Sequence, residues 1–307
     1  MTMVERALKI EHVGPLLQDE PLGKHSSWRT GGRAEYFFEP ADTADLINVV
    51  RQFGDKKITW LGLGSNMLIR DGGISGLVVS TAKGLNYLNW TKDEHLEVGC
   101  GVACAKIAKE AAKNGRTGGE FLAGIPGTIG GALAMNAGAF GGETWDLVAS
   151  AKVVNRQGDL TEIMPGDYVT GYRHVGLPND HWFISAKLYF PHDAGDEQGG
   201  TGAGQQKIRE LLTQRANTQP TGVASCGSVF KNPPDDYAGR LIEEAGLKGY
   251  KIGACRVSEK HANFIVNEQG ASAAEIESLI KHVQSRVLEQ FGILLEPEVR
   301  IVGEQVA

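Results

Sequence analysis

The chain has 307 residues, a formal net charge of −6 at pH 7 and an isoelectric point near 5.8. This acidic balance argues against a nucleic acid or an anionic membrane as the main partner. Hydrophobic residues make up 41% and charged residues 22%, which is typical of a globular protein and excludes wholesale disorder. The 41 glycines follow no collagen-like period, so they indicate many positions where the backbone turns at positive φ or approaches a ligand closely.

The cysteines and the N-terminus restrict the metal chemistry and the location of the protein. The N-terminal residues lack the apolar stretch of a signal peptide, and no segment approaches the roughly 18 apolar residues of a membrane span. We therefore expect a cytoplasmic protein with no membrane partner. The cysteines have no paired spacing, which predicts no metal site and free thiols: Cys100, Cys104, Cys226 and Cys255.

The first elements in chain order predict a β-α-β unit that forms a first domain over residues 1–82. Its helix has one apolar face and ends before Gly54, and its last strand is apolar enough to be buried on both faces. The expected elements are strands at Tyr36–Glu39, Ile58–Leu63 and Gly76–Ser80 and a helix at Asp42–Phe53.

A second unit is expected over residues 83–194. It contains a strand starting at Leu96–Val98, a helix at Ala103–Lys113, a hairpin at Val153–Ile163 and a long strand at Trp182–Phe190. The polar, glycine-rich run that follows Pro191 has the composition of an exposed linker. Gly199–Gly204 belongs to this run and follows no strand, so we interpret it as linker and not as a phosphate-binding loop.

The last unit, residues 195–307, is expected to be α+β. Its strongest element is a helix at Ser272–Phe291, with a capping box of Ser272 and Glu275, an apolar stripe that includes Leu288, and Gly292 at its end. The other expected elements are helices at Gln206–Asn217 and Tyr237–Ala245, a strand at Phe264–Val266 and a final strand at Leu294–Val302.

Two glycine clusters are candidate ligand sites. The first, Gly62, Gly64, Ser65 and Asn66, follows a strand, but Met67 replaces the third glycine of a dinucleotide fingerprint. It is either an anion-binding nest of backbone amides or a plain turn. The second, between residues 124 and 142, carries no charge and suits a planar or phosphorylated ligand. Its alternative is a glycine-packed helix start with Asn136 as a turn.

Three polar side chains could carry chemistry. Ser228 follows a glycine, so its hydroxyl could donate a proton, although a Gly-Ser turn explains the same residues. The guanidinium of Arg173 suits a carboxylate or phosphate, with a surface salt bridge as the alternative. Glu298 alternates with apolar residues beside Glu296 and Arg300, which alone indicates a solvated strand face.

Eight strings together resemble the bacterial UDP-N-acetylenolpyruvoylglucosamine reductases of peptidoglycan synthesis, from about Ser26 to Gly303. They are, in order, TGGRAEYF, LGLGSNMLI, GIPGTIGGALAMNAGAFGGE, TQP, GSVFKNP, AGRLIEEAGLKG, VSEKHANFIVN and LEPEVRIVG. The resemblance implies an α+β protein with a two-subdomain FAD-binding fold of the vanillyl-alcohol-oxidase type and a C-terminal substrate domain. It implies that NADPH reduces FAD, which then reduces a UDP-sugar enolpyruvyl ether.

The resemblance also implies roles for individual residues. Ser228 matches the general acid, and Arg173 and Glu298 match the pair that stabilises the enol. Arg215 and Asn232 are candidates for substrate contact. The residues that match the family's FAD-holding segments are Gly62, Gly64, Ser65, Asn66, Gly127, Thr128, Gly130, Gly131, Asn136 and Gly138.

The sequence departs from the family pattern around Arg173. Thr170 and Val175 stand where the family commonly has an aromatic residue and a serine, which affects the expected packing there. Two alternatives stay open: another flavin oxidoreductase of the same fold, such as an oxidase, and a non-catalytic flavin-binding module.

Overall fold

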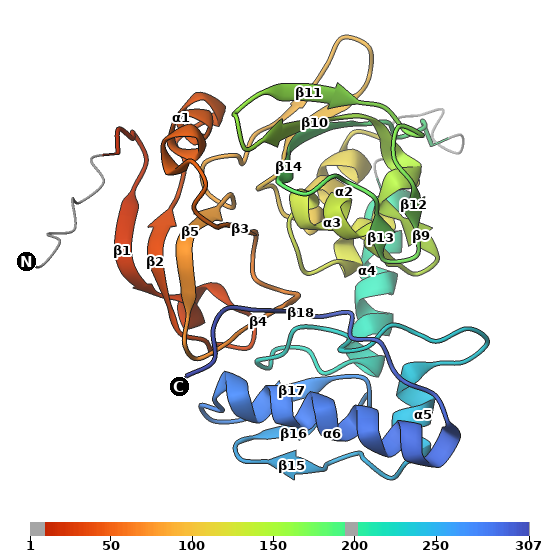
Figure 1. Cartoon of the computed structure of the whole chain (residues 1–307). Helices are drawn as coiled ribbons and strands as arrows, with labels where there is room; N and C mark the ends of the chain where they lie inside the picture. The colour runs from red at the N-terminus through yellow and green to blue at the C-terminus, as the bar shows by residue number, and fades with distance from the viewer. Residues whose placement is uncertain (1–9, 194–201, 307) are drawn as a thin grey trace, which may run out of the picture.

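The computed structural model describes residues 10–193 and 202–306. Figure 1 shows three groups of elements: a small sheet near the N-terminus, a larger sheet with helices on its concave side, and a C-terminal group around one long helix. Among the described residues, no helix is long and apolar enough to cross a membrane.

The N-terminal group is a four-stranded sheet in the order β1-β2-β5-β3. Strands β2 and β3 run parallel to β5, and β1 runs antiparallel to β2. The expected β-α-β unit is confirmed, while β1 and the 3-10 helix η1 are additions. The bounds are β1 (Leu16–Pro21), η1 (Leu22–His25), β2 (Arg33–Phe38), α1 (Thr43–Phe53), β3 (Ile58–Leu61) and β5 (Ile74–Ser80).

The second group is an antiparallel sheet in the order β11-β10-β14-β7-β6. Helices α2 and α3 pack with the sheet in one core, in which Val98 and Val153 of the sheet and Ile107 of α2 are buried. The expected hairpin is confirmed, and Gly158 turns it at φ +76°. The bounds are β6 (Leu88–Trp90), β7 (Leu96–Gly99), α2 (Cys104–Lys113), α3 (Ile129–Met135), β10 (Val148–Asn155), β11 (Leu160–Ile163) and β14 (His181–Leu188).

Short elements connect α2, α3 and the sheet. They form two small hairpins, β8-β9 and β12-β13, and two further 3-10 helices. The bounds are η2 (Glu120–Gly124), β8 (Gly138–Ala139), β9 (Gly142–Glu143), η3 (Thr144–Leu147), β12 (Thr170–Gly171) and β13 (His174–Val175). The β12-β13 hairpin turns at Tyr172 and Arg173.

Helix α4 (Gly202–Thr218) begins inside the expected linker. The interpretation of Gly202–Gly204 as linker is therefore wrong, and Gly199–Thr201 lie outside the described residues. A Cβ on Gly204 would come within 3.0 Å of the Ala112 Cβ, so glycine lets α4 approach α2 closely. Ile208 of α4 is buried in the core of the second group. The division at residues 82 and 194 stays a prediction.

The C-terminal group contains two helices and a three-stranded sheet, β15-β16-β17. The capping box of Ser272 and Glu275 is confirmed, and Gly292 ends α6 at φ +69°. The expectation that Leu288 faces the core is wrong, because it follows buried Val287 by about 100° around the helix and is 44% exposed. The bounds are α5 (Ala238–Glu244), β15 (Lys251–Ile252), β16 (Cys255–Val257), β17 (Ile265–Asn267) and α6 (Ala273–Phe291).

The expected strand at Leu294–Val302 is too long. Only β18 (Arg300–Val302) is a strand, and it pairs in parallel with β4 (Met67–Ile69) instead of the C-terminal sheet. Trp28 makes a separate contact with β17, since its buried Nε1 donates to the Ile265 carbonyl at 2.9 Å. The end of the chain thus lies against the segment that follows the first glycine cluster (Figure 1).

Candidate active site

The two glycine clusters lie against each other. A Cβ on Gly62 would meet the Thr128 Oγ1 at 2.5 Å, and a Cβ on Gly127 would lie 3.2 Å from the Ser65 Oγ. Gly64 adopts φ +61°, and a Cβ there would lie 2.0 Å from the His25 carbonyl oxygen. Glycine is therefore required at 62 and 64 for the close approach of these turns.

Both turns offer unused backbone donors. The amides of 62–65 and those of Gly127 and Thr128 donate to no acceptor within the described part of the chain. Buried or half-buried amides normally find a partner, so a group of them in two touching turns indicates a site for an anion. The pyrophosphate of FAD fits such a site, and Ser65 adds a hydroxyl beside it.

Helix α3 uses its own first amides internally. The amides of Ile129 and Gly130 donate to Val102 and Cys100 carbonyls, and that of Gly131 donates to the Thr128 Oγ1 at 3.4 Å. A Cβ on Gly130 would lie 2.8 Å from the Cys100 Cβ, so this glycine is explained by packing against the protein's own core. Gly131 is exposed and has only the Thr128 Oγ1, at 3.8 Å, near its missing side chain.

Asn136 ends α3 in the left-handed conformation, at φ +44°. The alternative interpretation, a helix start with Asn136 as a turn, is confirmed for the backbone. Its side chain is buried, donating to Glu143 Oε2 at 2.7 Å and accepting from the Trp145 amide at 3.1 Å. Asn136 therefore fixes the chain that leads from α3 to the β8-β9 hairpin.

Arg173 and Glu298 form an ion pair across 125 residues of sequence. Arg173 Nε donates to Glu298 Oε1 at 2.9 Å, and the two side chains are only 17% and 14% exposed. A second guanidinium nitrogen of Arg173 donates to the Gly138 carbonyl at 3.0 Å, which ties the pair to the β8-β9 hairpin. The solvated-face alternative is thus wrong for Glu298, although it holds for exposed Glu296, which pairs with Lys231.

Burial raises the pKa of Glu298, and the neighbouring Arg173 charge opposes that rise. A partly desolvated guanidinium held in this way can neutralise negative charge that develops on a bound carboxylate.

Ser228 lies beside this pair through the backbone. The Val229 carbonyl accepts from the Glu298 amide at 2.8 Å, so the segments carrying Ser228 and Glu298 run next to each other. Ser228 is half-buried, and its hydroxyl has no hydrogen-bond partner within residues 10–193 and 202–306. Asn66 Nδ2 donates to the Glu298 carbonyl at 3.0 Å, which joins the first glycine turn to the same point.

The two candidates for substrate contact are Arg215 on α4 and Asn232 in the segment before α5. Arg215 of α4 donates to the Gly124 carbonyl and to Gln219 Oε1, and burial lowers its pKa. It is therefore near the start of the second glycine cluster. Asn232 is exposed, and its Oδ1 accepts from the Ala238 amide at 3.1 Å at the start of α5.

One buried residue near Ser228 gave no signal in the sequence analysis. Asn263 binds the backbone of Phe230 through both ends of its side-chain amide. It lies in a loop without periodicity, and no spacing rule distinguishes an asparagine that mimics a strand from one in an ordinary turn.

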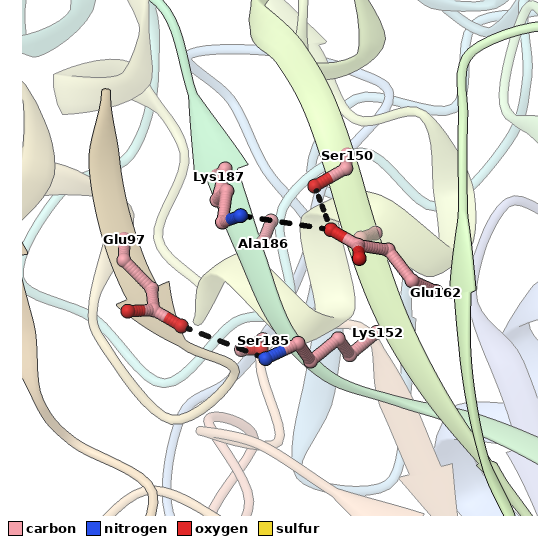
Figure 2. Close-up of a pocket in the computed structure, with 8 residues that line it drawn as sticks. Glu97, Ser150, Lys152, Glu162, Ser185, Ala186 and Lys187 are labelled. Atoms are coloured by element: carbon pink, nitrogen blue, oxygen red, sulfur yellow. Dashed lines mark hydrogen bonds and ion pairs between the residues drawn. The ribbon is translucent and has the colours of Figure 1, made fainter. Parts of the chain in front are cut away.

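Two further features are a polar patch on the five-stranded sheet and the four cysteines. Figure 2 shows a polar patch on the five-stranded sheet in which Lys152 pairs with Glu97 at 3.9 Å and Lys187 with Glu162 at 3.7 Å. Its opposite charges compensate each other on an open sheet surface. All four cysteines are free and buried, and burial raises the pKa of Cys226, beside the first glycine turn, to about 12.

The chain matches two family models and several known proteins. Residues 34–164 match an FAD binding domain, and residues 219–302 match the C-terminal domain of UDP-N-acetylenolpyruvoylglucosamine reductase. The UDP-N-acetylenolpyruvoylglucosamine reductase of Methylococcus capsulatus is 50% identical over 96% of this chain and 95% of its own length. That of Legionella pneumophila strain Lens is 48% identical over 99% of this chain and 97% of its own.

A solved structure agrees with the sequence comparisons. The crystal structure of the reductase of the same name from Thermus caldophilus superposes with a TM-score of 0.79 at 29% identity. The match covers 95% of this chain and 99% of that one. The fold is therefore an FAD-binding domain of the vanillyl-alcohol-oxidase type followed by the reductase C-terminal domain, as expected. The chain belongs to the UDP-N-acetylenolpyruvoylglucosamine reductase family.

Proposed function

We propose that this chain reduces UDP-N-acetylenolpyruvoylglucosamine to UDP-N-acetylmuramate in the cytoplasm, in peptidoglycan precursor synthesis. The observation that carries the proposal is the largely buried Arg173–Glu298 pair where the two glycine turns meet. It lies beside the Ser228 hydroxyl, which has no hydrogen-bond partner among the residues that the structure describes. Family membership supports the same reaction, since the relatives that cover nearly the whole chain carry this name.

FAD is the cofactor of this family, and the free amides of the glycine turns suit its pyrophosphate. Gly62, Gly64, Ser65 and Asn66 would hold it from one side, and Gly127, Thr128 and Gly131 from the other. Gly130, Asn136 and Gly138 support this wall through their packing and hydrogen bonds. When bound, FAD accepts a hydride from NADPH and delivers it to the substrate.

In the second step, the protein's own residues neutralise developing charge and donate a proton. As the enolpyruvyl double bond is reduced, negative charge develops toward the substrate carboxylate, which the Arg173 guanidinium neutralises. Glu298 holds that guanidinium in place through its hydrogen bond. The Ser228 hydroxyl donates a proton to the carbon next to the carboxylate. Arg215 and Asn232 are proposed to contact more distant parts of the substrate.

An anaerobic absorbance experiment tests the proposal. Protein loaded with FAD should lose its flavin absorbance on adding NADPH and recover it on adding the enolpyruvyl substrate, with UDP-N-acetylmuramate found by mass spectrometry. A flavin that only oxygen reoxidises would instead indicate an oxidase. A flavin that NADPH does not reduce would indicate the non-catalytic module, and either result would refute the proposed reaction.

A further inference from the structure

Asn263 is buried inside the C-terminal group, where its side-chain amide and its backbone carbonyl form hydrogen bonds. Its side chain is 4% exposed and lies in the loop between β16 and β17. Its Oδ1 accepts from the Phe230 amide at 2.9 Å, and its Nδ2 donates to the Phe230 carbonyl at 2.8 Å. Its own carbonyl accepts from the Val229 amide at 2.9 Å. Asn263 therefore pairs with this segment as a neighbouring strand would.

On its other edge, the same segment pairs with the chain that carries Glu298. The Val229 carbonyl accepts from the Glu298 and Val299 amides at 2.8 and 3.3 Å, and Phe230 bridges to Pro297. The segment that begins at Ser228 thus lies between Asn263 and the chain that carries Glu298. A shift on the Asn263 side would move the Ser228 hydroxyl relative to the Arg173–Glu298 pair.

We propose that Asn263 is a positioning residue for the Ser228 proton donor. The inference rests on the proposed function, and it assigns to Asn263 no contact with substrate. Three hydrogen bonds, two from the side chain and one from the backbone, fix the backbone one and two residues beyond Ser228. Ser228 follows Gly227, which turns at φ +75°, so the chain changes direction just before the proton donor.

Asn263→Asp is the sharpest variant, because it keeps the size and the acceptor of the side chain and removes the N–H that binds the Phe230 carbonyl. Asn267→Asp is the matched control. Asn267 is also buried, and its Nδ2 donates to the Trp28 carbonyl at 2.8 Å while its Oδ1 accepts from the Ala271 amide at 2.9 Å. Both variants place a carboxyl in a buried site of the same group, but only the Asn263 side chain binds the segment that begins at Ser228. Asn267 reaches the preceding chain through its backbone amide alone, which donates to the Ala224 carbonyl at 2.9 Å.

The readouts are the two half-reactions by stopped-flow absorbance and the hydrogen exchange of individual backbone amides. In Asn263→Asp, flavin reduction by NADPH should stay within about twofold of wild type, while reoxidation by substrate slows by about tenfold to 100-fold. The Val229 and Phe230 amides should exchange faster in the protein without substrate. Asn267→Asp should leave the ratio of the two rates and these two amides unchanged.

Equal slowing of both half-reactions in Asn263→Asp, or the same rate ratio in both variants, would overturn the inference. If Asn263→Asp does not fold, Asn263→Ser, which is smaller and uncharged, takes its place with the same expectations. Wild-type turnover is measured in the same experiment, so failure of the proposed reaction is distinguishable from failure of the Asn263 role.

Discussion

Gly130 and Gly131 are neighbouring glycines of α3 with opposite surroundings. Gly130 faces Cys100 of the protein's own core, whereas Gly131 faces open space beside the free amides of the glycine turns. Sequence alone makes the two equivalent members of one cluster, because a glycine required for packing and a glycine required for a ligand look alike. Their difference depends on what lies within a few ångströms in the folded chain.

Substitutions at these two glycines should therefore separate cofactor binding from folding. Gly131→Val should lower the FAD content of the purified protein with little change in the melting temperature of the apoprotein. Gly130→Val should destabilise the apoprotein by about 1 to 3 kcal/mol, because the side chain would overpack against Cys100. Flavin absorbance per mole of protein and thermal unfolding measure both effects. Normal flavin content in Gly131→Val would place the cofactor elsewhere.

The positive charge of Arg173 should lower the pKa of Glu298. Burial raises the pKa of Glu298, and the positive charge of Arg173 opposes the rise. Arg173→Gln removes the opposing charge, so the pKa of Glu298 rises further and the carboxylate forms only at higher pH. The pKa of Glu298, followed through the NMR signal of its carboxyl carbon, should therefore be higher in Arg173→Gln than in wild type. The rate of flavin reoxidation by substrate should fall by about 10² to 10³, because the guanidinium that neutralises the developing charge is gone.

Arg173→Lys is the control, since it keeps the positive charge without the fork of hydrogen bonds. It should raise the pKa of Glu298 less than Arg173→Gln does, and it should still slow reoxidation by substrate. An equal Glu298 pKa in wild type and Arg173→Gln would contradict the account of Glu298.

At the scale of elements, hydrogen bonds and ion pairs of charged side chains join α6 to the segment after β4. The Asp71 carboxylate accepts from the Ala273 and Ala274 amides at the start of α6, both at 2.9 Å. One turn further, Glu277 accepts from Arg70 Nε at 2.9 Å and pairs with Lys281 at 2.8 Å. Arg70 is the main reason that the pKa of Glu277 falls from 4.5 to about 2.

Glu277→Gln should therefore destabilise the protein in a pH-dependent way. The pKa of Glu277 is lower in the folded than in the unfolded chain, so its contribution is present above pH 4.5 and is lost as the pH falls toward 2. Urea unfolding should show a loss of about 2 kcal/mol at pH 7 that shrinks steadily below pH 4.5. Glu289→Gln on the same helix removes only an exposed pair with Arg286 and should have little effect.

Sequence analysis predicted elements with local causes better than those with distant partners. The Ser272 capping box, the apolar stripe of α6 apart from Leu288 and the Val153–Ile163 hairpin depend on neighbours in sequence, and the structure confirms them. The expected strand at Leu294–Val302 failed because its partner, β4, lies more than 230 residues earlier. The prediction of a linker at Gly202–Gly204 was wrong for a related reason, since α2 supplies the surface against which that turn of α4 packs.

Across the whole molecule, the candidate site draws on segments far apart in sequence. The turn after β3, the start of α3, the β12-β13 turn and the chain before β18 meet around the free amides and the Arg173–Glu298 pair. Resemblance to the family named the principal residues, but it could not show that Glu298 is buried or that Asn66 binds its carbonyl. Those facts follow from the pairing of β18 with β4 and from the contacts of Glu298 with Asn66 and Arg173.

The central claim is that Ser228 acts only in the second half-reaction, after NADPH has reduced the flavin. Stopped-flow absorbance of Ser228→Ala tests it, because alanine removes the hydroxyl with little change in volume. Flavin reduction should proceed at nearly the wild-type rate, and reoxidation by substrate should slow by about 10² to 10⁴. Ser225→Ala, which removes a nearby buried hydroxyl without a hydrogen-bond partner in the described part of the chain, should leave both rates nearly unchanged. Equal slowing of the two half-reactions in Ser228→Ala, or unchanged reoxidation, would contradict the account.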